Sequence, residues 1–213
     1  MYCILVVNDS PIVADVLRSM LERGGYRTAT ASGGEECLAL LEDMTPDLIL
    51  LDVRMRPMDG WETLEHLKAD TGTREIPVAM HTAKHLTPDE IQQYGHLIED
   101  YILIPTTHRQ LFDAVEYILN KKARIANEIE FARRSGADSR LIEEFRRLSQ
   151  SVDVFRRLIR FLELSTRTTD MTMRLGEQLF EAIKTMASGE RCMELRLEEL
   201  KREFHSGRAP GAA

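Results

Sequence analysis

The chain has few of the residues that stabilise small secreted or metal-bound domains. Cysteine occurs three times in 213 residues, as Cys3, Cys37 and Cys192. Their uneven spacing fits neither a disulfide framework nor the usual ligand pattern of a zinc site. We therefore expect three reduced thiols and a cytoplasmic location.

Long apolar segments are also absent. No run of apolar residues reaches the ~20 residues that a membrane-spanning helix needs. The first residues lack the basic and apolar segments of a secretion signal. Both absences argue against a membrane partner and again predict a cytoplasmic protein.

Charge is divided unevenly along the chain. Residues 1–120 carry 9 Lys and Arg against 20 Asp and Glu, a net charge of −11, whereas residues 121–213 carry 19 against 15, a net charge of +4. This difference predicts two modules with different tasks. The acidic first module argues against contact with nucleic acid there.

Apolar runs alternate with helix-like segments through about residue 120. Short apolar runs bounded by turn residues predict strands at residues 2–7, 26–30, 47–51, 76–80 and 101–104. Helix-start signals, such as Ser10-Pro11, follow these runs. Five consecutive βα units predict an α/β fold with a parallel sheet and helices on both of its faces.

Carboxylates follow two of the expected strands. Asp52 ends the apolar run from Asp47, and the pair Asn8-Asp9 follows the run from Tyr2. In an open α/β sheet, the carboxyl ends of such strands meet where the strand order reverses. Two converging carboxylates repel each other unless a cation lies between them, and Mg²⁺ prefers oxygen ligands of this kind. A metal-neutralised aspartate at this place can act as a nucleophile toward phosphorus.

These features match several motifs in register, and residues 1–120 resemble the CheY-like receiver domain of two-component response regulators. The resemblance implies a flavodoxin-like, doubly wound sheet with the strand order 2-1-3-4-5. The matching positions are the acidic pair Asn8-Asp9, Asp52, the loop from Met55 to Asp59-Gly60, Thr82-Ala83, and Tyr101.

The resemblance also implies a role for each residue. Asp9, Asp52 and the backbone carbonyl of Arg54 would bind Mg²⁺ or Mn²⁺, and Asn8 would act through a metal-bound water. Asp52 would accept a phosphoryl group from a sensor histidine kinase or a phosphotransfer protein. Thr82 would then hydrogen-bond a phosphoryl oxygen, and Tyr101 would be the switch aromatic.

The sequence departs from the family pattern at three places. Ile104 stands where the family has a lysine before the proline that follows the fifth strand, and Lys84 is the candidate substitute. Asn8 replaces the commoner acid, which predicts weaker metal affinity. Proline is displaced by one residue, to Pro57, so that Arg56 takes its usual place and Arg54 and Arg56 bring positive charge to the rim.

Beyond residue 120 the apolar periodicity predicts long helices and matches no family that we recognise. We expect a receiver domain at 1–120, a continuation of its last helix at 121–136, a long-helix hairpin at 137–205, and a disordered tail at 206–213. Gly136 is the predicted terminator, and Gly189 is expected to break or bend the last helix. The narrow apolar seam predicts that the hairpin pairs with a second chain in a four-helix bundle or coiled coil, with a monomeric three-helix packing as the alternative.

These observations predict a phosphorelay response regulator that controls a helical dimerisation or partner-docking region and has no catalytic domain of its own. The main alternative is a degenerate pseudo-receiver that acts as a scaffold without phosphorylation, because Ile104 removes a cation.

Further functions have weaker support. A phosphatase would rest on Glu177-Gln178, and a DNA-binding output on Arg146-Arg147 and the arginines at 156, 157 and 160, which also fit the solvated flank of a seam. No histidine occurs between residues 121 and 200, which argues against a histidine phosphotransfer bundle. His81 and His85 are expected to be surface or loop residues, because no third metal ligand accompanies them.

Overall fold

The computed structural model describes residues 1–84, 86–168 and 173–206. The chain divides into two compact units. The first contains Met1–Thr87 and Leu97–Leu119, and the second contains Pro88–His96 and the chain from Asn120 onward. The predicted tail falls outside the described residues from position 207 on, and so does His85.

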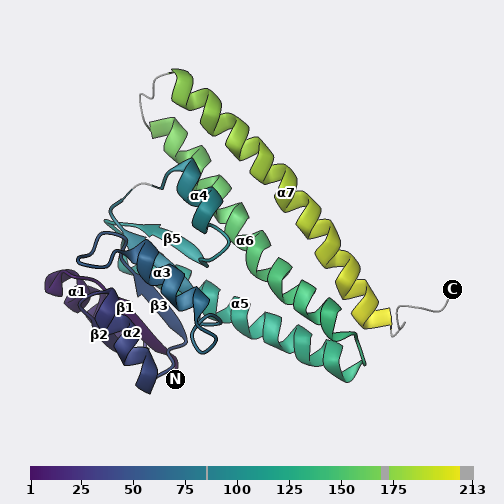
Figure 1. Cartoon of the computed structure of the whole chain (residues 1–213), viewed down its shortest axis with the longest axis horizontal. Coiled ribbons are helices and arrows are strands. Elements are labelled where there is room, and N and C mark those ends of the chain that lie inside the picture. The colour runs from purple at the N-terminus through teal and green to yellow at the C-terminus, as the bar shows by residue number, and fades with distance from the viewer. Residues whose placement is uncertain (85, 169–172, 207–213) are drawn as a thin grey trace. The chain divides into compact units, whose positions relative to one another are not determined.

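The first unit contains five parallel strands in the order β2-β1-β3-β4-β5 (Figure 1), which confirms the predicted fold class and strand order. Four parallel pairings hold the sheet together. The strands are β1 (Cys3–Val7), β2 (Arg27–Ala31), β3 (Leu48–Leu51), β4 (Val78–Thr82) and β5 (Asp100–Leu103).

Three helices connect the first four strands: α1 (Pro11–Arg23), α2 (Gly34–Asp43) and α3 (Gly60–Ala69). Pro11 begins α1, where a missing backbone N–H does no harm. Asp59 begins α3 with a capping box, in which its side chain accepts hydrogen bonds from the first turn and Glu62 bonds back to the Asp59 N–H.

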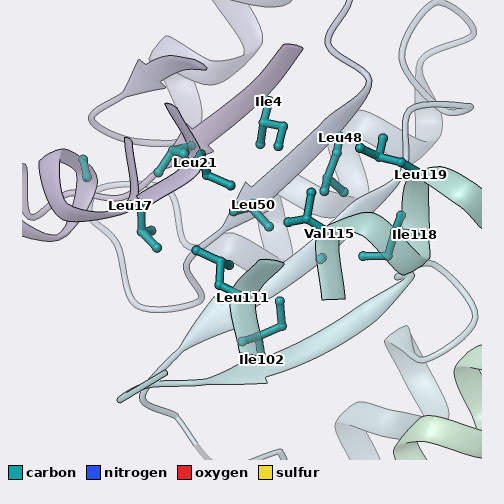
Figure 2. Packing of buried hydrophobic residues seen from close by; sticks show 13 residues of the cluster. Ile4, Leu17, Leu21, Leu48, Leu50, Ile102, Leu111, Val115, Ile118 and Leu119 are labelled. Atoms are coloured by element: carbon teal, nitrogen blue, oxygen red, sulfur yellow. The ribbon is translucent and has the colours of Figure 1, made fainter. Parts of the chain in front are cut away.

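One face of the sheet packs against α1 and the first part of α5 (His108–Arg134). Figure 2 shows Ile4, Leu48 and Leu50 from the strands beside Leu17 and Leu111 from the two helices. Each such side chain contributes roughly 1.5–3 kcal/mol when it is fully buried. This packing holds the strand ends, and therefore the turns that follow them, in a constant relative position.

The fourth strand lies two residues later in the chain than the sequence pattern predicted. Pro77 has no N–H to donate, and the N–H of Ile76 bonds to the Thr73 carbonyl in a turn, so the ladder begins at Val78. The shift brings His81 and Thr82 into the strand. Both are buried, so the expectation that His81 is a surface or loop residue was wrong.

The second unit is helical. It contains α4 (Pro88–Tyr94), the last part of α5, α6 (Ser139–Thr168) and α7 (Met173–Ser206). Gly136, at φ 77°, follows α5 as predicted, since this left-handed conformation suits glycine. Gly189 does not break α7, which runs through it. Among the described residues, no helix combines the length and the hydropathy that a membrane span requires.

Helices α6 and α7 run side by side in opposite directions (Figure 1). Their ion pairs show the antiparallel order. Arg196 of α7 donates to both carboxylate oxygens of Glu144 of α6, at 2.8 and 3.0 Å. Arg156 of α6 pairs with Glu190 of α7 at 2.9 Å.

The end of α5 completes a three-helix core with α6 and α7. The buried residues of this core are Ile129, Ala132, Ile142, Phe145, Leu200 and Phe204. The three-helix packing that the sequence left open is therefore present within one chain. The coiled-coil homodimer stays a prediction, and the side chains of its expected seam at positions 155, 162, 175, 179, 182 and 186 lie outside the described part.

Replacing Phe145 by alanine tests this core. Phe145 is 2 % exposed and meets Phe204 edge to face, with ring centroids 5.5 Å apart. We expect the substitution to lower the free energy of unfolding of the helical unit by about 3–5 kcal/mol, as buried Phe-to-Ala changes do. Urea denaturation followed by circular dichroism measures this. Leu195→Ala, at a side chain 57 % exposed, is the matched control and should change stability by less than about 0.5 kcal/mol.

Candidate functional site

Polar residues follow the carboxyl ends of β1 and β3, as the sequence pattern predicts. Asn8 directly follows β1 and is buried, whereas Asp9 is exposed. The Asn8 N–H donates to the Ala31 carbonyl of β2 at 3.0 Å, so the ladder continues through this residue. The Asn8 side-chain oxygen accepts the Ser10 N–H at 2.8 Å, which orients the amide group.

Asp52 directly follows β3 and is half-buried. Its backbone N–H donates to the Val7 carbonyl at 3.0 Å, which holds it beside Asn8. The Asn8 amide nitrogen donates to Asp52 Oδ2, and the Arg54 N–H donates to Asp52 Oδ1, both at 3.2 Å. Each carboxylate oxygen therefore accepts at least one hydrogen bond.

The first residue of α3 lies against the backbone of Asp52. A Cβ atom on Gly60 would come within 2.1 Å of the Asp52 carbonyl oxygen and 2.8 Å of Val53 Cα. The Gly60 N–H also donates to the Val53 carbonyl at 2.9 Å. Only glycine allows the helix and the Asp52 turn to approach this closely.

Thr82 and Tyr101 meet at the backbone of Lys84. The Lys84 N–H donates to Thr82 Oγ1 at 3.2 Å, and the Tyr101 hydroxyl donates to the Lys84 carbonyl at 2.7 Å. Tyr101 is buried and stacks on Trp61 of α3, with ring centroids 6.4 Å apart. Tyr101 is thus fixed at both its ring and its hydroxyl group.

His81 precedes Thr82 in β4 and is 3 % exposed. Neither ring nitrogen has a hydrogen-bond partner in the described part of the chain. Burial lowers the pKa of His81 to about 4, and the charge of Asp52 opposes that shift. The imidazole is therefore neutral at pH 7.

Positive charge lies at the rim of the site. Arg54 and Arg56 are exposed, and Lys84 is half-buried. Ile104 contributes its N–H to the Thr82 carbonyl at 2.9 Å, and its side chain carries no charge. These basic residues belong to the β3–α3 turn and to the loop after β4.

The oxygen atoms at this edge fit a hard divalent cation. The ligands predicted from the sequence, namely the carboxylates of Asp9 and Asp52 and the Arg54 carbonyl, all supply oxygen atoms. The described residues contain no cluster of three or more His, Cys, Asp or Glu side chains that could enclose a metal. Mg²⁺ usually binds through one or two carboxylates and retains several waters, so this donor set suits it.

The strand ladder places Asn8 and Asp52 side by side, and the loop after β4 joins Thr82 to Tyr101. The metal ligands and residue roles themselves stay predictions. Sequence reasoning missed Trp61, the close approach of Gly60 to the Asp52 backbone, and the burial of His81. Extending the predicted strand by two residues beyond the apolar run from Val78 to Met80 would have included His81 and indicated its burial.

Comparison with protein families finds two matches along the chain. Residues 4–116 match the family described as "Response regulator receiver domain". Residues 121–208 match the family described as "Metanogen output domain 2". The second match lies in the region for which the sequence pattern indicated no family.

Individual proteins resemble about half of the chain. The DNA-binding dual master transcriptional regulator RpaA of Synechocystis is 33% identical over 122 residues, 57% of this chain and 51% of that protein. This chain therefore spans about half the length of that relative.

Solved structures cover a similar share. The N-terminal domain of a response regulator receiver protein from Methanoculleus marisnigri is 62% identical and covers 56% of this chain and 97% of that one, with a TM-score of 0.48. The receiver domain of the sensor histidine kinase PA1611 from Pseudomonas aeruginosa is 27% identical, covers 56% and 98%, and has a TM-score of 0.51. That structure holds a magnesium ion in its active-site cleft.

Gly60→Ala tests the close approach at Asp52. The added Cβ would force α3 away from the turn, and we expect a loss of about 1–3 kcal/mol in the free energy of unfolding, as overpacking produces. Urea denaturation measures the loss. Gly189→Ala is the matched control, because nothing lies within 4 Å of its Cβ position. In the exposed interior of α7 this control should stabilise the chain by about 0.5–1 kcal/mol.

The buried histidine predicts a dependence of stability on pH. An unfolded histidine takes up a proton near pH 6.5, whereas native His81 does so only near pH 4. Between these values the unfolded state binds more protons, so stability falls as the pH falls, by roughly 3 kcal/mol from this group. Denaturation midpoints between pH 7 and pH 4 should show a shallower fall for His81→Leu than for the unchanged protein. The exposed His66→Leu variant should keep the original dependence, and an equal slope in His81→Leu would contradict the assignment.

Proposed function

Since the chain belongs to the response regulator receiver family, we propose that it is a phosphorylation-controlled signalling protein with Asp52 as its phosphoacceptor. The observation that carries the proposal is the position of Asp52 at the carboxyl end of β3, beside Asn8 and hydrogen-bonded to it. In this reaction an Asp52 oxygen attacks phosphorus, and the bond from phosphorus to the donor's leaving atom breaks. The donor of the phosphoryl group would be a histidine kinase or a phosphotransfer protein.

Mg²⁺ or Mn²⁺ would be held by Asp9, Asp52 and the Arg54 carbonyl, with Asn8 acting through a bound water. When bound, the ion neutralises negative charge on the carboxylates and on the phosphoryl oxygens. The exposure of Asp9 and the half-burial of Asp52 support this assignment, because a metal that keeps several waters needs an open side.

The other residues of the site would bind the phosphoryl group and transmit its presence to Tyr101. Thr82 would donate its hydroxyl hydrogen to a phosphoryl oxygen while its oxygen keeps the Lys84 N–H. A movement of Thr82 would then act on the Lys84 carbonyl, which holds the Tyr101 hydroxyl. Lys84, Arg54 and Arg56 would supply the positive charge that Ile104 does not.

We assign the output to the helical region, which would dock a protein partner or a second copy of the chain. The similarity of residues 121–208 to a family described as an output domain supports this role. Helix α5 also supports it, because Leu111 and Val115 pack in the core of the first unit and Ile129 and Ala132 in that of the second. A conformational change in α5 would therefore alter the packing of both cores.

A protein partner fits this region better than DNA. Arg146 forms an ion pair with Glu143, and Arg156 forms one with Glu190, so these two arginines are already paired with carboxylates of the helices. The side chains of Glu177 and Gln178, on which a phosphatase would rest, lie outside the described residues. We propose a regulator whose helical region acts by docking a partner, without a second catalytic centre.

A phosphorylation-independent scaffold is the second candidate, and the uncharged Ile104 is the observation that favours it. A scaffold would bind its partners identically with and without a phosphodonor. A test of whether Asp52 takes up a phosphoryl group or its mimic separates the two candidates.

Beryllofluoride with Mg²⁺ tests the phosphoacceptor directly, because it mimics the phosphoryl group on an aspartate. We expect saturable binding by the full chain, detected by fluorine NMR, and none by Asp52→Asn. Radiolabelled acetyl phosphate should label the unchanged chain and leave Asp52→Asn unlabelled.

Asp47→Asn is the matched control, since Asp47 lies at the opposite end of β3 and accepts the Cys3 N–H. It should bind beryllofluoride as the unchanged chain does. Absence of binding and of labelling in the unchanged chain would favour the scaffold.

A further inference from the structure

A row of side chains crosses the carboxyl edge of the sheet. Val7 pairs with Leu51, and Leu51 pairs with Met80. One residue further along the same register, Asn8, Asp52 and His81 fall in one row. The N–H of Asp52 extends the ladder to the Val7 carbonyl. Neighbouring strands lie ~4.8 Å apart, and partners in register share a face, so His81 flanks Asp52 on the side opposite Asn8.

The two residues that flank Asp52 differ in how their polar atoms are hydrogen-bonded. On one side, the Asn8 amide is hydrogen-bonded through both of its polar atoms, since its nitrogen donates to Asp52 Oδ2 and its oxygen accepts the Ser10 N–H. On the other side, His81 has both ring nitrogens buried and unpaired among the described residues. Buried polar groups are nearly always hydrogen-bonded, so an exception calls for an explanation.

The neighbours of His81 in the sheet do not supply one. Its partner in β5 is Ile102, and Ala79 lies two residues before it on the same face. Both are apolar members of the core. Helix and strand packing alone would be satisfied by an apolar side chain at position 81.

The chemical form of the ring defines what it can bind. A histidine ring carries at least one N–H donor in either protonation state, so His81 can donate a hydrogen bond to an acceptor at Asp52. Asp52 follows the β3 register beside His81, and each of its carboxylate oxygens already accepts at least one hydrogen bond. In the described part of the chain the free carboxylate forms no hydrogen bond to His81, whereas phosphorylation would add new acceptor oxygens at Asp52.

We propose that His81 donates a hydrogen bond to the acyl phosphate formed on Asp52 and thereby holds that group on the side opposite Asn8. This inference rests on the proposed phosphoacceptor function and assigns His81 to the same site. The neutral donor acts in addition to the basic groups at the rim, which approach from the β3–α3 turn and the loop after β4. The unpaired nitrogen of the free state gains its partner on phosphorylation, which favours the phosphorylated state.

Substitutions at position 81 test the hydrogen bond in the full chain. His81→Leu removes the donor, whereas His81→Asn and His81→Gln keep an N–H near the positions of Nδ1 and Nε2. We expect His81→Leu to weaken Mg²⁺-dependent beryllofluoride binding by roughly ten- to a hundred-fold, the range for a hydrogen bond to a charged group. At least one of the two amide variants should recover most of that affinity. Met80→Leu, on the other face of β4, is the packing control and should bind normally.

The result can overturn the inference in two ways. Unchanged binding by His81→Leu would show that no bond forms, and equal losses in all three variants would show that the ring acts only through its shape. Urea denaturation of each variant identifies losses that follow from unfolding. If the unchanged chain binds beryllofluoride and Asp52→Asn does not, either result refutes the His81 inference alone. If the unchanged chain does not bind it, the proposed function fails first.

Discussion

The site depends on the register of three parallel strands. Because β1, β3 and β4 are aligned residue by residue, their carboxyl ends place Asn8, Asp52 and His81 in one row. The packing of α1 and α5 on one face keeps the strands in that alignment. A slip of one residue in any pairing would turn one of these side chains to the other face of the sheet.

A few neighbouring residues fix the geometry around Asp52. Asn8 and the Arg54 N–H orient the carboxylate, and the absence of a side chain at Gly60 lets α3 lie against its backbone. The next residue of α3 is Trp61, which stacks on Tyr101. The turn after Asp52 is therefore connected by direct packing to the residue expected to act as the switch.

The helical unit has a different physical basis. Its core is small and lies where the end of α5 meets α6 and α7. Away from this core, charge pairs such as Arg196 with Glu144 align the two long helices. Exposed ion pairs of this kind contribute only about 0–1 kcal/mol each, so they set the pairing of the helices more than its strength.

The sequence by itself determined the class of fold, the strand order by resemblance, the helix ends at Pro11 and Gly136, and the candidate acids at positions 9 and 52. Periodicity and turn chemistry are local, so they can be read along the chain. The tertiary structure alone decided where β4 begins, that His81 is buried beside Asp52 with no hydrogen-bond partner among the described residues, and that Trp61 packs on Tyr101. It also decided that α5, α6 and α7 form a core within one chain. These features arise from contacts between residues far apart in the sequence, and no local pattern specifies which of them will meet.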